Sequence, residues 1–159
     1  ASGKCEFYSE ALGTLGLDPL PTWLPPRESA ATDPALAARF PLSLNSPPER
    51  NFLNSTFANL ERFTVPLQEP SIVIHPEDAA RRGVADGDAV RVFNDRGSVR
   101  LRASVSDKSR PGTVTALSVW WRKKSPDGQN INALTSQALT DMAGGATFYD
   151  CLVEVEAIA

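Results

Sequence analysis

Residues 89–106 constrain the fold more than any other stretch, because they have the pattern of a β-hairpin. AVRVFN at 89–94 and SVRLRASVS at 98–106 both alternate apolar and polar side chains, as strands with one buried face do. The turn between them, Asn94-Asp95-Arg96-Gly97, contains residues that tolerate the left-handed backbone of a tight turn. We therefore predict two antiparallel strands, with Val99, Leu101, Ala103 and Val105 inward and Arg100 and Arg102 outward.

Apolar segments elsewhere predict the remaining strands. Main strands are predicted at residues 40–45, 71–75, 113–121 and 151–158, and a shorter strand at 4–9. Six main strands, few helices and no internal repeat together favour a mainly β fold. Such a count suggests a small closed barrel with crossover connections.

Two short helices are predicted outside these strands. Residues 76–83 begin with proline, carry acids in the first turn and arginines in the last, and end at Gly83. His75, the sole histidine, precedes that proline, and with no Cys or second His nearby we expect it to lead into the helix. Residues 9–16 predict the other helix, with Ser9 as its N-cap.

The domain organisation is predicted as residues 1–39, an approach segment and proline-rich connector, followed by residues 40–159, the barrel domain. Prolines at 19, 21, 25, 26 and 34 remove backbone donors and disfavour helix, which predicts an extended connector lying on a surface. Leu20, Trp23 and Leu24 are expected to pack against something. Because the chain starts directly on a strand-like CEFYS with no initiator Met, we expect a piece of a longer polypeptide.

Composition and charge exclude several classes of partner. With 159 residues, 42% of them hydrophobic, the chain can bury a core. Lys and Arg number 16 against 19 Asp and Glu, a net charge of -3, which argues against nucleic-acid binding through a basic surface. No apolar run approaches the length of a membrane span. The compartment, cytoplasmic or periplasmic, is left open, because an export signal would lie upstream.

The reactive residue types do not form a catalytic pattern. Cys5 and Cys151 lie near opposite ends without a CxxC motif, so we expect two free thiols, with Cys151 buried in a strand. The carboxylates at 77, 78, 86 and 88 are explained by helix capping and turns. Without a nucleophile and a base, the chain alone is not expected to be catalytic.

Two polar loops are the candidates for binding. Residues 46–59 are predicted to hold one helical turn at 51–57, with Phe52, Leu53 and Phe57 inward, and residues 122–147 one turn at 132–136. Embedded Leu134, Leu139 and Met142 favour an ordered second loop. The polar groups of the two loops are Asn45, Ser46, Arg50, Asn54 and Ser55, and Gln129, Asn130, Asn132, Thr135 and Ser136. Amides suit heterocycle edges, and Arg and hydroxyls suit phosphate, but polar loops are commonly only solvated.

A family resemblance gives these loops a ligand. The strings that carry it are FPLSLNSPPERNFLNSTFANL, HPEDAARRGVADGDAVRVFNDRGSVRLRASVSDKSRPGTV, Trp120-Trp121, NINALTS and GGATFYDCLVEVE. In this order they closely resemble the C-terminal molybdopterin-dinucleotide-binding domain of the molybdopterin oxidoreductase superfamily, which includes dimethyl sulfoxide reductase and formate dehydrogenase. The preceding SGKCEFYSEAL and GLDPLPTW resemble the segment that leads into that domain.

The resemblance implies a six-stranded double-psi β-barrel with a few short helices. It implies that the cofactor is bis(molybdopterin guanine dinucleotide) holding Mo or W. The partners that it implies are upstream domains of the same polypeptide, with electron-transfer subunits as a further candidate. By that resemblance Asn45, Ser46 and Arg50 approach the dinucleotide, and Asn54 and Ser55 contact a pterin or its phosphates. Asn132 binds from the second loop, and Tyr149 bounds the pocket. The metal ligand and any iron–sulfur site lie in earlier domains.

The leading hypothesis is therefore the cofactor-binding domain of a molybdenum or tungsten oxidoreductase, which positions the dinucleotide while upstream domains carry out electron or oxygen-atom transfer. The alternative is a cofactor-free barrel that acts as a structural or protein-interaction module. A third hypothesis, a self-processing small enzyme resembling aspartate decarboxylase, would need Gly97-Ser98 as its cleavage site. That pair is already explained as the exit of a hairpin.

Overall fold

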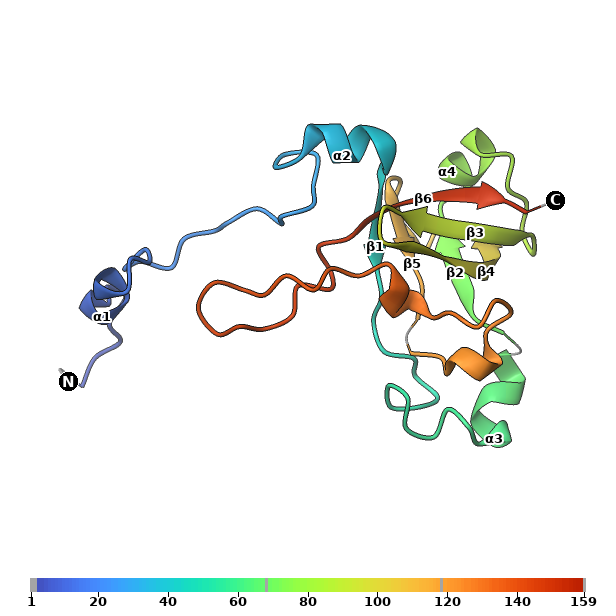
Figure 1. Ribbon diagram of the computed structural model, residues 1–159, viewed down its shortest axis with the longest axis horizontal. Helices are drawn as coiled ribbons and strands as arrows, with labels where there is room; N and C mark the ends of the chain where they lie inside the picture. The colour runs from blue at the N-terminus through green and yellow to red at the C-terminus, as the bar shows by residue number, and fades with distance from the viewer. Residues whose placement is uncertain (1–2, 68, 118, 159) are drawn as a thin grey trace.

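A computed structural model describes residues 3–67, 69–117 and 119–158, and its centre is a closed six-stranded β-barrel (Figure 1). Around the barrel the strands follow the order β1-β5-β2-β4-β3-β6. Their bounds are β1 (Leu42–Asn45), β2 (Ser71–Ile74), β3 (Ala89–Asn94), β4 (Gly97–Val105), β5 (Thr113–Thr115) and β6 (Leu152–Ala157). Position 118 of the predicted strand 113–121, and positions 1, 2 and 159 of the predicted domains, lie outside the described residues.

The pairing of the strands confirms the predicted barrel with crossovers. β3 and β4 form the antiparallel hairpin, with Val92 opposite Val99. β1 pairs with β5, and β2 with β4, in parallel. Parallel neighbours require crossover connections, which here give the double-psi arrangement. β6, last in sequence, pairs antiparallel with both β1 and β3 and closes the barrel.

Alternation along the strands fills the barrel with aliphatic side chains. Leu42 and Leu44 of β1 are each 1% exposed, and Ile72 and Ile74 of β2 are fully buried. In β4 the predicted inward residues 99, 101 and 103 are buried, and the arginines at 100 and 102 point outward. Val105, at the end of the strand, is only partly buried. Every second residue along these strands therefore points into the core.

Both predicted helices are present, and each begins at a residue whose side chain caps it. In α1 (Glu10–Thr14), the Ser9 hydroxyl accepts the Leu12 N–H at 3.4 Å. Before α4 (Pro76–Arg81), Nδ1 of His75 accepts the Glu77 N–H at 3.2 Å. His75, which was expected to lead into the helix, is therefore its N-cap.

Other short helices were not predicted, namely α2 (Pro34–Arg39), α3 (Glu61–Thr64), η1 (Val65–Leu67) and η2 (Arg122–Lys124). The helix η3 (Ile131–Ala133) overlaps the helical turn that was predicted in the second polar loop. The signal for α2 was present, because the Asp33 side chain caps the helix by accepting the Leu36 N–H at 2.9 Å and Pro34 follows at the first helical position. The turn predicted at 132–136 is shifted to η3, and residues 51–57 form turns rather than a helical turn.

Two predicted strands are corrected. Residues 4–9 form no strand, because the barrel is closed and offers them no free edge. β5 ends at Thr115, well before residue 121. Beyond it Trp120 is buried edge-on against Phe52, with ring centroids 5.5 Å apart, so the chain leaves the sheet to pack beside the first polar loop. Cys151 is buried as predicted, but it lies immediately before β6.

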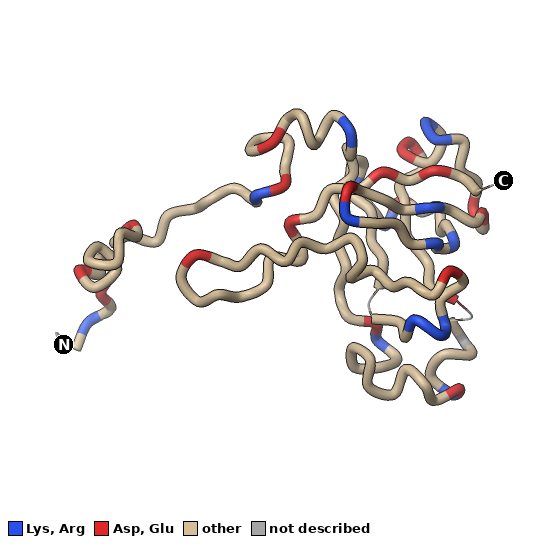
Figure 2. The backbone as a smooth tube through the Cα atoms, in the orientation of Figure 1, with Lys and Arg blue, Asp and Glu red and all other residues tan. Residues whose placement is uncertain are grey.

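The N-terminal segment extends away from the barrel, and the loop that precedes β6 projects to the same side (Figure 1). Leu20, Trp23 and Leu24, which are expected to pack against something, are 49%, 78% and 68% exposed within the described chain. Leu139 and Met142 in the projecting loop are also exposed. Acidic and basic residues are interspersed over the barrel (Figure 2). Among the described residues, no helix combines the length and apolar character needed to cross a bilayer.

Candidate functional site

Loops at one end of the barrel enclose a pocket of about 260 Å³. It is lined by Ser46, Pro48, Asn54, Val119, Asn132, Phe148 and Tyr149. β1 runs parallel to β5 and antiparallel to β6, so the segments that follow β1 and β5 and the segment that precedes β6 meet at the same end. The topology therefore brings together residues that are far apart in sequence.

The first wall of the pocket is the loop after β1. The buried Glu49 carboxylate accepts the backbone N–H groups of Arg50 at 2.7 Å and Asn51 at 3.3 Å, which fixes the start of the loop. Its middle is tied down by Trp121, whose indole Nε1 donates to the Ser55 carbonyl at 2.7 Å. Asn54 has a φ of +49°, in the left-handed region that asparagine tolerates better than most residues. The loop is thus held by the contacts of Glu49 and by the indole of Trp121 rather than by a helix.

The second wall is η3, which is organised by Asn130. The Asn130 side chain accepts the Asn132 N–H at 3.2 Å and donates to the Trp120 carbonyl at 3.3 Å. Asn130 therefore builds the turn, and Asn132 presents its amide to the pocket. Within the described chain, the side-chain amides of Asn54 and Asn132 make no hydrogen bond to protein atoms, so their donors and acceptors are available to a ligand.

The third wall consists of two aromatic rings. Phe148 and Tyr149 are 40% and 47% exposed, and their ring centroids lie 4.5 Å apart at a tilt of 56°. Exposed aromatic faces beside amides and the buried Ser46 hydroxyl suit a planar heterocycle that carries donors and acceptors on its edge. The donor set of the pocket fits a pterin or a nucleobase.

The structure brings four of the predicted site residues into this pocket, namely Ser46, Asn54, Asn132 and Tyr149. The other three lie outside its lining. Asn45 is exposed at the end of β1, where its carbonyl accepts the Ala116 N–H at 3.0 Å, and Arg50 is exposed on the loop. Ser55 is exposed and contributes its carbonyl to Trp121. The loop residues Leu53 and Phe57, predicted inward, are 65% and 54% exposed, whereas Phe52 is buried as predicted.

Three lining residues were missed, namely Pro48, Val119 and Phe148. Phe148 had a signal, because it adjoins Tyr149 in sequence and a pair of aromatic residues before a strand can form one ligand-facing surface. Pro48 and Val119 had none, because a proline in a loop and a valine in a predicted strand are both indistinguishable from ordinary packing.

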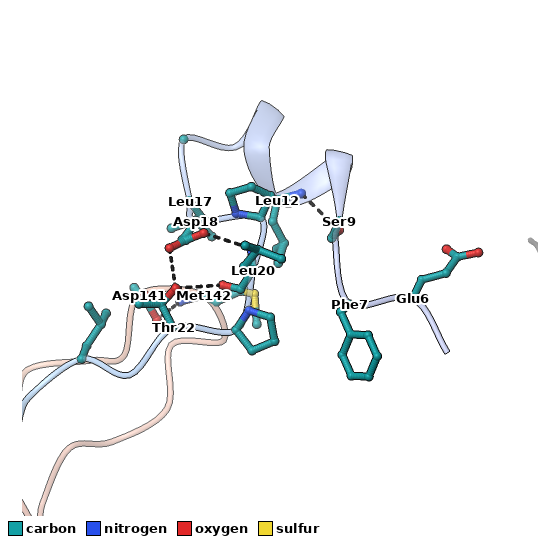
Figure 3. A pocket seen from close by; sticks show the side chains of 14 residues that line it. Glu6, Phe7, Ser9, Leu12, Leu17, Asp18, Leu20, Thr22, Asp141 and Met142 are labelled. Carbon is teal, nitrogen blue, oxygen red and sulfur yellow. Dashed lines mark hydrogen bonds between the residues drawn. The ribbon is translucent and has the colours of Figure 1, made fainter. Parts of the chain in front are cut away.

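A larger pocket, of about 600 Å³, lies between the N-terminal segment and the tip of the projecting loop (Figure 3). Its polar groups serve local structure. The hydroxyl of Thr22 and the backbone N–H of Leu20 both donate to Asp18 and lower the pKa of its carboxyl. Because this hollow is built mainly from residues 6–24 and shares no lining residue with the pocket at the barrel's end, we do not place the candidate site there. Among described residues, no cluster of three or more His, Cys, Asp or Glu has metal-site geometry.

Comparison with known proteins identifies the family of this chain and several relatives. Residues 42–152, which include every lining residue of the barrel-end pocket, match the family model described as the molydopterin dinucleotide binding domain. A probable oxidoreductase, YoaE of Bacillus subtilis, is 38% identical over 157 residues, which cover 99% of this chain and 22% of that protein. Dimethyl sulfoxide reductase DmsA of Escherichia coli is 34% identical, with 99% of this chain and 21% of that protein covered.

The fold is shared with a much larger enzyme. Acetylene hydratase from Pelobacter acetylenicus superposes with a TM-score of 0.85 at 23% identity, over 99% of this chain and 24% of that chain. The chain also spans only about a fifth of the length of YoaE and DmsA, 22% and 21% respectively. A likeness at this identity establishes the barrel and its connections, and nothing about a reaction.

Proposed function

This chain belongs to the molydopterin dinucleotide binding domain family, and from that premise we propose that it is the C-terminal cofactor-binding domain of a molybdenum or tungsten oxidoreductase. In this proposal residues 1–39 are the approach segment and residues 40–159 the domain proper. Relatives about five times as long are consistent with further domains in the same polypeptide, which would complete the cofactor site. Separate electron-transfer subunits are a further part of the proposal.

The observation that carries the proposal is the convergence of Ser46, Asn54, Asn132 and Tyr149 on one pocket within the family-matched region. When bound, bis(molybdopterin guanine dinucleotide) supplies the redox chemistry of its metal. The side chains of this domain bind and orient. The two amides donate to and accept from a ring edge, the aromatic pair covers a ring face, and the loops exclude water from the contact.

Asn45, Arg50 and Ser55 have a second role in the proposal. They lie on the same loop or at its start, outside the pocket lining, with exposed side chains. A dinucleotide is longer than one pterin, so an extended ligand leaving the pocket along this loop would reach them. Arg50 suits a phosphate, because a guanidinium donates several hydrogen bonds to an anion.

Cofactor content of the full-length enzyme tests the site. We expect Asn54→Ala and Asn132→Ala each to weaken cofactor retention about 5- to 30-fold, the effect of losing ~1–2 kcal/mol of hydrogen bonding. The measurement is the stoichiometry of metal and pterin after dialysis. Asn59→Ala is the matched control, because Asn59 is exposed on the same loop but does not line the pocket.

Two results would count against the proposal. Normal cofactor content in the Asn54→Ala, Asn132→Ala double variant would remove the site assignment. An enzyme purified without any pterin would favour the alternative, a cofactor-free structural or interaction module.

A further inference from the structure

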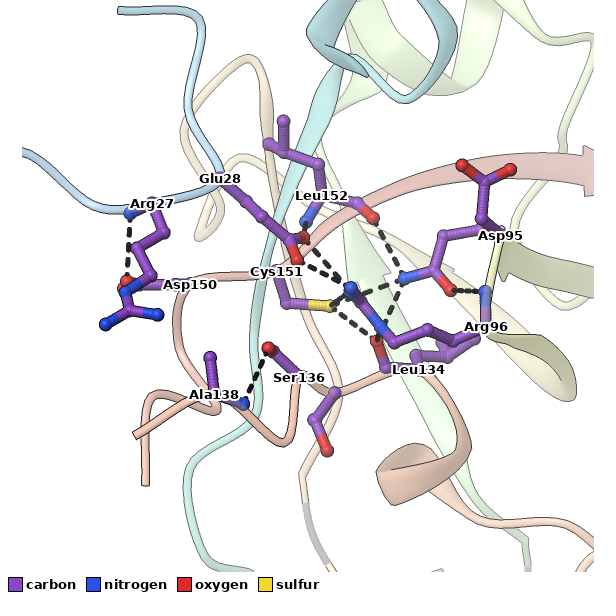
Figure 4. Close-up of polar contacts among 12 residues, drawn as sticks. Arg27, Glu28, Asp95, Arg96, Leu134, Ser136, Ala138, Asp150, Cys151 and Leu152 are labelled. Carbon is purple, nitrogen blue, oxygen red and sulfur yellow. Dashed lines mark hydrogen bonds and ion pairs between the residues drawn. The ribbon is translucent and has the colours of Figure 1, made fainter. Parts of the chain in front are cut away.

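Side chains at the tip of the β3–β4 hairpin hydrogen-bond to both ends of the segment from Leu134 to Leu152 (Figure 4). Asn94 Nδ2 donates to the Leu134 carbonyl at 2.9 Å and to the Leu152 carbonyl at 3.1 Å. Arg96 Nε donates to the same Leu134 carbonyl at 2.6 Å. One turn of the chain thus bridges two points that are 18 residues apart in sequence, 134 and 152.

These two anchor points adjoin the pocket walls. Leu134 lies two residues after Asn132, and Leu152 lies three residues after Tyr149. The hairpin tip also abuts η3 directly, because a Cβ added at Gly97 would lie 3.1 Å from the Ala133 carbonyl oxygen. The second and third walls of the pocket are therefore fixed against one hairpin.

The N-terminal connector contacts both the hairpin tip and the start of β6. Arg96 pairs bidentately with Glu28, at 2.5 Å and 3.0 Å, and Glu28 also accepts the Leu152 N–H at 3.1 Å. The side chains of Arg96 and Glu28 are only 32% and 14% exposed, and a bidentate pair of this kind is strong and directional. Next to it, the Arg27 N–H donates to Asp150 at 3.0 Å.

These contacts cover two buried residues, Leu134 and Cys151. Leu134 is fully buried and Cys151 is 1% exposed, with its thiol donating to the Leu134 carbonyl at 3.2 Å. Burial raises the pKa of the Cys151 thiol to about 11, although Arg96 nearby acts to lower it. If the Arg96 side chain moved away, the Leu134 carbonyl would lose one of its donors and water could reach the Cys151 thiol.

We propose that Asn94, Arg96 and Glu28 form a clasp that positions Asn132 and Tyr149, so that the hairpin and the connector preorganise the cofactor pocket without touching the ligand. The inference rests on the proposed function, because it names positioning residues for the same site. Preorganised walls bind more tightly because their ordering entropy is lost on folding rather than on binding. Arg96 joins all three segments, so its side chain has the largest effect.

Alkylation of Cys151 in the full-length enzyme, followed by peptide mass spectrometry, reports on the clasp independently of the cofactor. We expect Arg96→Ala to label Cys151 at least about tenfold faster than the parent, because local opening exposes a buried group. Arg91→Ala is the control, since Arg91 precedes the same turn and pairs with Glu156 at 2.9 Å on the exposed face of β3 and β6. We expect parental labelling in that variant.

The pH profile of the labelling separates an open clasp from a mere loss of charge. Arg96 and Glu28 are the charged groups that face the thiol. If the loop stays closed without Arg96, the pKa of Cys151 rises above about 11, because a stabilising cation is gone. If the clasp opens, the pKa falls toward the ordinary value of 9.0, because the thiol is hydrated. The proposal therefore requires that the pKa of Cys151 falls in the Arg96→Ala variant.

Cofactor retention then tests positioning. We expect Arg96→Ala to weaken it about tenfold, Arg96→Lys to restore part of the loss, and Arg96→Ala with Asn132→Ala to lose less than the product of the two single effects. Glu28→Gln is the milder variant if Arg96→Ala does not fold, and it should label Cys151 faster and lose cofactor in the same direction. Parental retention in Arg96→Ala or Glu28→Gln, alongside a defect in Asn132→Ala, overturns the clasp alone. Parental retention in Asn132→Ala as well overturns the proposed site.

Discussion

The barrel and the loops at its end are stabilised in opposite ways. Leu44, inside the barrel, is held by apolar neighbours from other strands and needs no specific partner. The loop carbonyls are held by a few polar side chains: Trp121 donates to that of Ser55 at 2.7 Å, and Asn94 and Arg96 donate to that of Leu134 at 2.9 Å and 2.6 Å. Burial is spread over many residues and tolerates imperfect geometry, whereas a loop depends on a few directional contacts.

This contrast has a consequence for function. A barrel secured by its own core can carry loops whose shape is set separately, so ligand contacts change without loss of the fold. The large stability effects should therefore lie in the barrel, and the local effects on shape in the loops. Matched substitutions in the two regions test that division.

The largest effect is expected in the barrel. Leu44→Ala should destabilise the chain by about 2–5 kcal/mol, because it removes buried methyl groups and leaves a cavity. Leu24→Ala makes the same chemical change at a side chain that is 68% exposed, and should shift stability by less than about 0.5 kcal/mol. Urea unfolding curves of the two variants give the comparison. Equal losses would mean that the connector is packed in solution and that the contrast is false.

The next effect lies where the loop enters the barrel, at Cys151. Its pKa in the folded chain is raised to about 11 from the ordinary 9.0, so the folded state keeps a proton that the unfolded chain releases. Its contribution is fully present below about pH 9 and is lost as the pH rises through about 11, by up to roughly 3 kcal/mol. Stability measured across this range should fall more steeply in the parent than in Cys151→Ala. Cys5→Ala, at an exposed thiol, should keep the parental slope.

A smaller and local effect is expected in the first loop. Trp121→Phe removes the indole donor to the Ser55 carbonyl and should cost about 0.5–1.5 kcal/mol. Hydrogen exchange should rise at residues 53–57 and stay unchanged in β2 and β4. Trp23→Phe is the control, at a side chain that is 78% exposed. Faster exchange spread through the strands would mean that loop and barrel open together.

The smallest effect is expected at a surface ion pair. Arg39 at the end of α2 pairs with Asp95 in the hairpin turn, and both side chains are more than half exposed, at 58% and 54%. Arg39→Ala should cost less than about 1 kcal/mol, and less still in high salt. Thermal unfolding at two salt concentrations measures it. A loss as large as that of Leu44→Ala would show that polar contacts between segments can match the core.

The sequence predicted the elements that have a local pattern. The β3–β4 hairpin was placed to within a residue, since its alternation and its turn occupy adjacent positions. α4 was found from Pro76 and its charged turns. β5 was drawn too long, because TVTALSVWW is equally apolar whether it pairs with a strand or, as Trp120 does, packs on Phe52.

The site was predicted less completely than the fold, because the contacts that form it join segments far apart in sequence. Family resemblance supplied the polar residues, and four of them line the pocket, while Arg50 and others lie beside it. Residue type alone could not say that Asn130 builds its own turn whereas Asn132 faces the pocket. The pairing of Glu28 with Arg96 joins positions 68 residues apart, and no local pattern encodes such a contact.

The position of β6 governs when the domain can be completed during synthesis. This strand is the last of the six to leave the ribosome, yet it lies between β1 and β3, which are made much earlier. Until residues 152–157 emerge, β1 and β3 each present an unpaired edge, and such edges invite pairing with other chains. Because Tyr149 and Cys151 directly precede this strand, the pocket at the barrel's end is completed in the same step that pairs the two remaining strand edges.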